Sequence, residues 1–176
     1  MQFYEALGLE PRLVVDSEDL KKRFYERSRQ WHPDRFSRSS PAEQHQSLEM
    51  TSTLNDAFRT LRDPVARAEY FLEHNGIVPS KHVPPELLEE VFEMNIALEE
   101  LRAGDESARP QLAEAHQRFN HMREEIDHGL SVLFMRYDEG KDSSHLLAIR
   151  SVLDRRQYIA NLIRDVEKEL NVHVPN

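Results

Sequence analysis

Apolar residues recur along nearly the whole chain at the three- and four-residue spacing of helices, and no segment alternates like a strand. Near the N-terminus, Leu20, Phe24 and Trp31 fall on one stripe of a helix. Asp16 is a typical N-cap, and Pro33 ends the helix because the residue before a proline is disfavoured in the α region. The pattern therefore predicts an all-α fold that includes a helix from about 16 to 31.

A second helix is predicted after a short polar loop. The segment Ser40–Glu43 has the sequence of a capping box, with proline at the first helical position. Asp63-Pro64 then starts a short helix over Val65–Asn75, and Gly76 is suited to its C-terminal cap. Apolar side chains continue the longer helix at Leu54, Phe58 and Leu61.

The stretch between 77 and 85 contains three prolines and has no helical pattern, so we expect a domain boundary there. Three helical segments follow, and their short connections predict antiparallel neighbours in a three-helix bundle. These segments are 86–103, 107–137 and 144–170. The predicted organisation is an N-terminal domain over 1–76, a linker over 77–85 and a bundle over 86–176.

Composition narrows the class of protein. Hydrophobic residues make up 39% and charged residues 31%, which is typical of a soluble globular protein. No apolar run approaches the roughly 18 residues of a membrane span, and the first residues resemble neither a signal nor a transit peptide. The absence of cysteine excludes disulfides and thiolate sites and fits a reducing compartment. We therefore expect a cytoplasmic protein.

Charge is distributed unevenly along the chain. The net charge is −9, which argues against general nucleic-acid binding. Residues 20–38 nevertheless contain seven basic and only two acidic side chains, whereas residues 77–176 contain 12 basic and 19 acidic ones. The first helix thus has a basic face that suits an acidic protein partner.

The tripeptide His32-Pro33-Asp34 follows this basic helix directly. Pro33 restrains the backbone of the loop, and the Asp34 carboxylate can form a bidentate pair with an arginine of a partner. His32 adds a hydrogen-bond donor and an acceptor beside that contact. Taken alone, the tripeptide could equally be a helix stop and the basic stripe a solvated face.

The flanking residues favour the functional interpretation, because the N-terminal segment resembles the J-domain family. Tyr4–Leu9 is similar to the first short helix of that family, and Ala57-Phe58 through Asp63-Pro64 is similar to the end of its third helix. The resemblance implies contact with a DnaK-type chaperone and stimulation of ATP hydrolysis by that chaperone. The residues to which it assigns this contact are His32, Pro33, Asp34, Lys21, Lys22, Tyr25, Arg29 and Arg35.

Arg27 departs from the J-domain pattern, which usually has leucine on this apolar stripe. A buried, unpaired guanidinium is costly, so its stem is expected to pack while its head reaches water or a carboxylate. An enlarged docking face is the alternative.

The second half resembles the HscB family, the J-domain co-chaperones of iron–sulfur cluster biogenesis. The resemblance rests on Arg67–Leu72, the proline-containing linker and the acidic bundle. It implies binding of an IscU-like scaffold protein and its delivery to an HscA-like chaperone. The side chains to which it assigns scaffold binding are Leu88, Glu89, Phe92 and Tyr158.

The pattern of apolar positions after residue 86 agrees with a partner site. One 4-3-4-3 run is expected to line the core of the bundle, whereas Leu88 and Phe92 are left on a neighbouring face. An exposed apolar pair of this kind usually marks a binding site, although a place in the core is the simpler alternative. The core run consists of Leu87, Val91, Met94, Leu98 and Leu101.

We expect no enzymatic activity, no cofactor and no metal. The histidines lack the i, i+4 spacing of helical zinc pairs, and iron–sulfur clusters prefer thiolates. Phosphate-binding loops and nucleophile motifs are missing too. The main alternative to a bacterial HscB-type adaptor is a J-domain adaptor for another client, whose bundle serves as a generic binding or dimerisation module.

Overall fold

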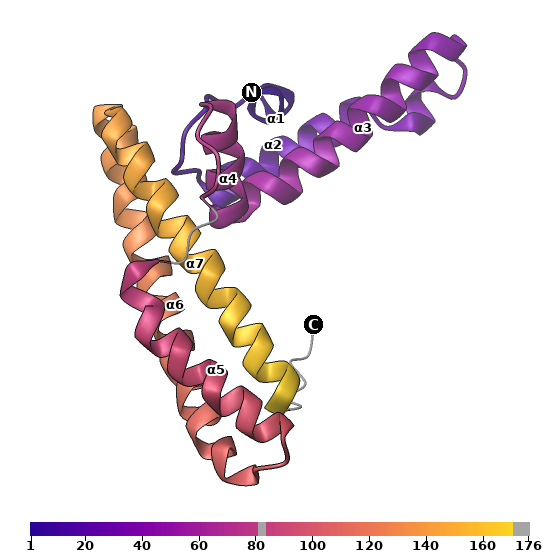
Figure 1. Ribbon diagram of the computed structural model, residues 1–176. Coiled ribbons are helices and arrows are strands. Elements are labelled where there is room, and N and C mark those ends of the chain that lie inside the picture. The colour runs from indigo at the N-terminus through magenta and orange to yellow at the C-terminus, as the bar shows by residue number, and fades with distance from the viewer. Residues whose placement is uncertain (81–83, 171–176) are drawn as a thin grey trace. The chain divides into compact units, whose positions relative to one another are not determined.

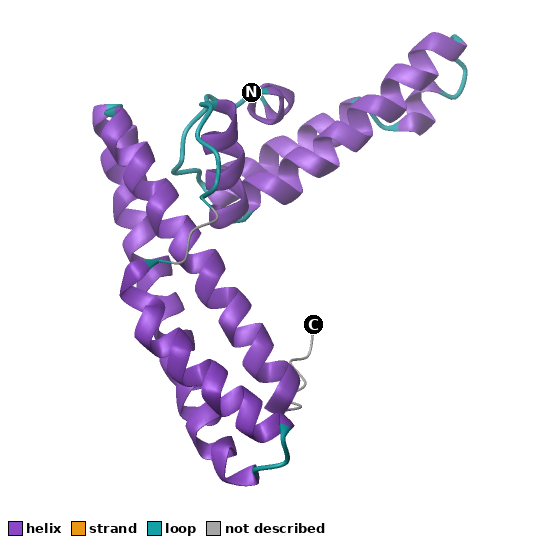
Figure 2. Cartoon of the chain, in the orientation of Figure 1, coloured by secondary structure: helices purple, strands orange, loops and turns teal. Residues whose placement is uncertain are grey.

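The computed structural model describes residues 1–80 and 84–170, and over these ranges the chain is helical without strands (Figure 2). The predicted all-α class is confirmed. No described helix is both long and apolar enough to cross a membrane. The elements are α1 (Gln2–Leu7), α2 (Ser17–Gln30), η1 (Pro33–Phe36), α3 (Pro41–Arg62), α4 (Pro64–His74), η2 (Pro85–Leu87), α5 (Leu88–Arg102), η3 (Glu106–Ala108), α6 (Arg109–Gly140) and α7 (Ser143–Leu170).

The N-terminal helices begin at the caps that the sequence predicts. The Asp16 carboxylate accepts the backbone N–H groups of Glu18 and Asp19, at 2.8 and 2.9 Å. Ser40 and Glu43 form a complete capping box, and the hydrogen bonds from Ser40 lower the pKa of the Glu43 carboxyl. Side-chain acceptors therefore satisfy amide groups that the first turn of each helix leaves without partners.

Contacts divide the chain into two compact units, of which the first comprises Met1–Val78 and Phe134–Leu146. Within it, α2 and α3 form the antiparallel hairpin that Figure 1 shows in purple, with the rings of Phe24 and Phe58 stacked 4.4 Å apart. The buried Arg67 of α4 donates to the carbonyl oxygens of Leu13 and Leu61. Burial lowers the pKa of this guanidinium, which its two carbonyl partners hold in place.

The turn between α6 and α7 also packs in the first unit, which the sequence does not predict. Asp138, whose side chain is only 4% exposed, accepts the backbone N–H groups of Leu13 and Val14 at 3.1 and 2.7 Å. The ring of Tyr137 meets that of Phe71 edge to face. Lys141, not a glycine, takes the left-handed conformation after α6.

The second unit comprises 79–133 and 147–176, of which the structure describes 79–80, 84–133 and 147–170. Helices α5, α6 and α7 enclose a core that includes Met94, Leu98 and Phe119. The expected core run of α5 is buried at Leu87, Met94 and Leu98 and half-buried at Val91 and Leu101. Parts of the expected linker and bundle, residues 81–83 and 171–176, lie outside the described residues, and the limits 1–76, 77–85 and 86–176 stay a prediction.

Candidate functional site

The exposed face of α2 contains the basic residues expected to meet a chaperone. Lys22, Tyr25 and Arg29 lie three and four residues apart and so share one side of the helix, with Lys21 beside them. All four side chains are exposed. Phe24 and Leu20 point the other way into the hairpin, because Phe24 stacks on Phe58 and Leu20 is buried. The helix thus presents a cationic surface with one aromatic ring in it.

The loop after α2 presents the Asp34 carboxylate almost fully to solvent, at 91% exposure. The Nδ1 atom of His32 accepts the backbone N–H of Asp34 at 3.3 Å and so caps the short 3-10 helix that Pro33 begins. The same Nδ1 atom lies 3.5 Å from the Asp34 carboxylate. The loop therefore presents an imidazole and a carboxylate side by side, with Arg35 exposed next to them.

Two hydroxyl groups of α3 hold the end of α2 in place, which the sequence analysis did not anticipate. Ser47, fully buried, donates to the carbonyl oxygen of Trp31 at 2.7 Å. The Thr51 hydroxyl lies between two acceptors, the carbonyl oxygen of Trp31 at 3.1 Å and that of Ser47 at 2.8 Å. The indole of Trp31 also stacks on the ring of Phe36, with centroids 5.8 Å apart. The base of the loop is therefore anchored while its tip stays exposed. The i, i+4 spacing of two hydroxyls on the inner face of α3 is the signal that marks them.

The structure resolves the position of Arg27. The side chain is half-buried, and its guanidinium lies against Gly8 at the end of α1. A Cβ atom at Gly8 would come within 3.0 Å of the Arg27 Nη2 atom, and the φ of +67° at Gly8 also favours glycine. The Arg27 stem therefore packs while its charged end lies at the turn after α1, away from Lys22 and Arg29 on the basic face.

The outer face of α5 carries exposed apolar side chains. Leu88 is 55% and Phe92 67% exposed, and Glu89 beside them is exposed as well. Ile96, one turn further on, is 41% exposed, and the sequence analysis did not single it out. Met94 points in the opposite direction into the core. The α5 patch, defined here as Leu88, Glu89 and Phe92, is thus a surface and not part of the core.

Tyr158 of α7 lies level with the α5 patch. Arg155 lies 3.9 Å from Glu86, and Arg102 lies 2.6 Å from Glu169. The first pair joins η2, directly before α5, to α7, and the second joins the C-terminal ends of both helices. Helices α5 and α7 therefore run parallel, as Figure 1 also shows. The tyrosine is half-buried.

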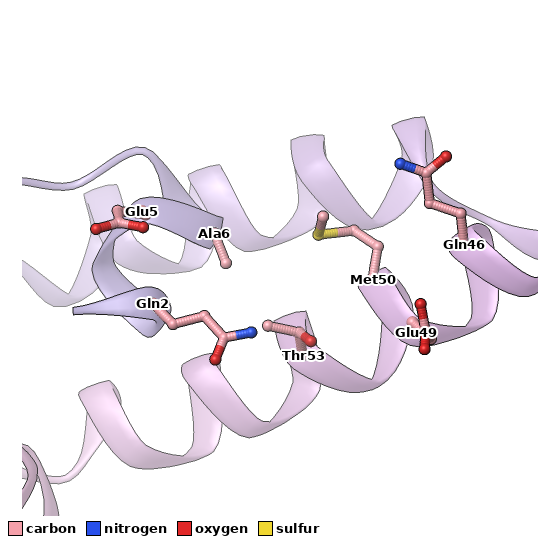
Figure 3. Close-up of a pocket in the computed structure, with 7 residues that line it drawn as sticks. All are labelled: Gln2, Glu5, Ala6, Gln46, Glu49, Met50 and Thr53. Atoms are coloured by element: carbon pink, nitrogen blue, oxygen red, sulfur yellow. The ribbon is translucent and has the colours of Figure 1, made fainter.

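A groove of about 430 Å³ lies between α1 and α3 of the first unit (Figure 3). Ala6 and Met50 line it together with the carboxylates of Glu5 and Glu49. Glu5 lies 3.5 Å from the N-terminal amine and Glu49 3.2 Å from His45, so both carboxylates are paired within the chain. Among the described residues, no group of three or more histidine and carboxylate side chains could hold a metal ion.

Comparison with known proteins shows the class of protein to which the chain belongs. Residues 2–70 match the family model "DnaJ domain", and residues 83–167 match the model "HSCB C-terminal oligomerisation domain". The chain is therefore a J-domain protein with a second, helical domain. Because both domains match in this order, it belongs to the HscB family of co-chaperones.

The individual relatives agree with this assignment. A co-chaperone protein HscB homolog of Neisseria meningitidis is 37% identical over 60% of this chain, and the match spans 66% of that protein's length. HscB of Proteus mirabilis is 43% identical over 44% of each chain. The solved structure of HscB from Vibrio cholerae is 27% identical, covers 96% of both chains and has a TM-score of 0.66. Human HscB, 24% identical with a TM-score of 0.68, shares the fold and covers 95% of this chain and 81% of its own.

Proposed function

We propose that this protein is a bacterial, cytoplasmic co-chaperone that binds an IscU-like iron–sulfur scaffold, delivers it to an HscA-like chaperone and stimulates ATP hydrolysis by that chaperone. The observation that carries the proposal is the presence of two separate exposed surfaces of different chemistry. One is the polar loop at Asp34 with the basic face of α2, and the other is the apolar α5 patch. An adaptor that joins two proteins needs two such surfaces.

The contact with the ATPase is assigned to the loop and to α2. The exposed Asp34 carboxylate can accept two parallel hydrogen bonds from an arginine of the chaperone, a strong charge-assisted pair. Lys21, Lys22 and Arg29 attract an acidic surface and speed the encounter. Tyr25 supplies an apolar contact within the same face. The chain itself makes and breaks no covalent bond in this proposal, because the chaperone performs the hydrolysis.

The contact with the scaffold is assigned to the α5 patch together with Tyr158. Exposed leucine and phenylalanine side chains one helical turn apart gain free energy when a partner removes them from water. The half-buried Tyr158, level with them on α7, extends this surface across two helices. Glu89 makes the patch more polar than two apolar side chains alone.

The test of the proposal is single-turnover ATP hydrolysis by an HscA-like or DnaK chaperone, measured with this protein, with an IscU-like scaffold, and with both. We expect stimulation by this protein alone and a further, more than additive increase when the scaffold is present. Purely additive rates contradict the adaptor role. Running both chaperones side by side identifies the cognate ATPase as the one stimulated at the lower concentration of this protein.

Self-association is the second candidate role of the bundle, since the matching C-terminal family model is named for oligomerisation. Sedimentation of the wild-type chain and of the Leu88→Ala/Phe92→Ala variant distinguishes the two roles. A monomeric wild type leaves the patch available to the scaffold. A dimer that the double substitution dissociates assigns the patch to a second copy of the chain.

A further inference from the structure

Ile96 continues the apolar face of α5 beyond the patch that the family resemblance assigns. Leu88, Phe92 and Ile96 are spaced i, i+4 and i+8, so they follow one another along a single side of the helix. Their exposed fractions are 55%, 67% and 41%. Isolated apolar side chains on a surface are ordinary, but three in a row form a continuous strip about 12 Å long.

We propose that Ile96 is a third apolar contact for the scaffold protein, so that the binding surface covers a little over two turns of α5. This inference rests on the proposed function, because it concerns the same partner. Ile96 lies next to the α5 patch on the same side of the helix. Met94 and Leu98 are buried in the core, so the side of α5 that carries Ile96 faces solvent. A partner that covers Leu88 and Phe92 along the helix reaches Ile96 by extending one turn.

The charges beside the strip restrict the kinds of partner that can bind there. Glu89, Glu93 and Glu100 are exposed and follow the strip along one edge. A row of carboxylates repels an anionic membrane or a nucleic acid, so neither is a suitable occupant of this face. A protein with an apolar recess bordered by neutral or basic groups fits both the strip and its edge.

The first experiment measures scaffold affinity by titration calorimetry for Ile96→Ala, with Ile96→Val as the conservative variant. We expect the Kd to rise about fivefold for Ile96→Ala, which corresponds to about 1 kcal/mol, and to change little for Ile96→Val. Burial of less apolar surface should also make the heat-capacity change of binding less negative for Ile96→Ala. Val132→Ala is the matched control, because Val132 is another β-branched side chain of the second unit with 38% exposure.

The second experiment uses the absence of cysteine in the natural chain. Single-cysteine variants Ile96→Cys and Val132→Cys are alkylated with iodoacetamide, with and without the scaffold, and the mass of this chain reports the extent of labelling. The scaffold should slow labelling severalfold at position 96 and leave position 132 unaffected. A purely structural role of Ile96 does not produce this difference.

The results distinguish a failure of the proposed function from a failure of the Ile96 contact. If the wild-type chain does not bind the scaffold, the proposed function fails. If the wild type binds and Leu88→Ala weakens binding, but Ile96→Ala does not and position 96 stays unprotected, the third contact is wrong. An equal loss of affinity in Val132→Ala also overturns it, since the effect is then not specific to this strip.

Discussion

The loop of the first unit and the outer face of α5 present opposite chemistry to solvent. At the loop, a carboxylate, an imidazole and a row of cations stand on a base held by hydrogen bonds to the carbonyl of Trp31. On α5, exposed aliphatic and aromatic side chains form a strip, with carboxylates along one edge. The first surface suits an encounter that is fast and geometrically demanding, whereas the second suits a contact whose free energy comes from removing apolar area from water.

Because the two surfaces differ in chemistry, a substitution can disable one and leave the other intact. They lie in different compact units, and the groups that shape the loop share no residue with those that shape the α5 patch. Substitutions at sites that share no partner act additively as a rule.

Asp34→Asn should abolish stimulation of the chaperone and leave scaffold affinity unchanged. The substitution keeps the size of the side chain but removes the charge needed for a bidentate pair with arginine. Single-turnover ATP hydrolysis and calorimetric titration of the scaffold measure the two effects. Glu73→Gln, which neutralises another exposed carboxylate of the same unit, is the control. Undiminished stimulation by Asp34→Asn refutes the assignment of the loop.

Leu88→Ala combined with Phe92→Ala should weaken scaffold binding by about 2 kcal/mol, roughly thirtyfold in Kd, because both side chains lose apolar contact area. Stimulation of the chaperone in the absence of scaffold should not change. Leu147→Ala removes an equally exposed leucine, at 62%, from α7 and should bind normally. Circular dichroism checks that the double variant is folded, and an unchanged scaffold Kd in the folded variant contradicts the assignment of the patch.

Asp138→Ala should lower the free energy of unfolding by about 2 kcal/mol, since it leaves the amide groups of Leu13 and Val14 without their acceptor. It also removes a carboxylate 3.7 Å from Arg12 and 3.2 Å from Lys141. Urea denaturation measures the loss. Affinity for the scaffold at low urea should remain, because Asp138 does not belong to the unit that holds the α5 patch. A variant as stable as the wild type contradicts the structural role of this carboxylate.

Raising the salt concentration from about 0.05 M to about 0.3 M should weaken the chaperone contact severalfold and the scaffold contact less. Exposed charges such as Lys21, Lys22 and Arg29 are screened within the shorter Debye length, whereas apolar burial is not. The concentration of this protein at half-maximal ATPase stimulation and the scaffold Kd give the two slopes. Equal slopes contradict the contrast between a charged and an apolar surface.

Much of the first unit follows from local sequence. The caps at Asp16 and Ser40 depend on side chains that bond amide groups two or three residues away, so no distant contact is needed to predict them. The same holds for the end of α2 before Pro33. In α5, periodicity correctly separates the core side of Met94 and Leu98 from the exposed side of Leu88 and Phe92. Binding at these exposed side chains stays a prediction.

Other features escape local reasoning. Ser47 and Thr51 are ordinary polar residues in the sequence, and only the packing of α3 against α2 brings their hydroxyls to the Trp31 carbonyl. Asp138 lies more than a hundred residues from the amide groups that it accepts. Hydrophobic periodicity does not predict these hydrogen bonds, because they depend on which helix ends meet in three dimensions.

The amino-acid sequence is enough to predict the all-α class, the approximate bounds of the principal helices, the loop at His32-Pro33-Asp34 and the resemblance to the HscB family. These features depend on backbone restraints, caps and periodicity, which act over a few residues. Three features become visible only in the folded chain. The turn at Tyr137 and Asp138 packs in the first unit, Tyr158 lies level with the α5 patch, and Ile96 stays exposed beside that patch. Those features depend on how helices distant in the chain pack, and packing is decided by the whole set of buried side chains together.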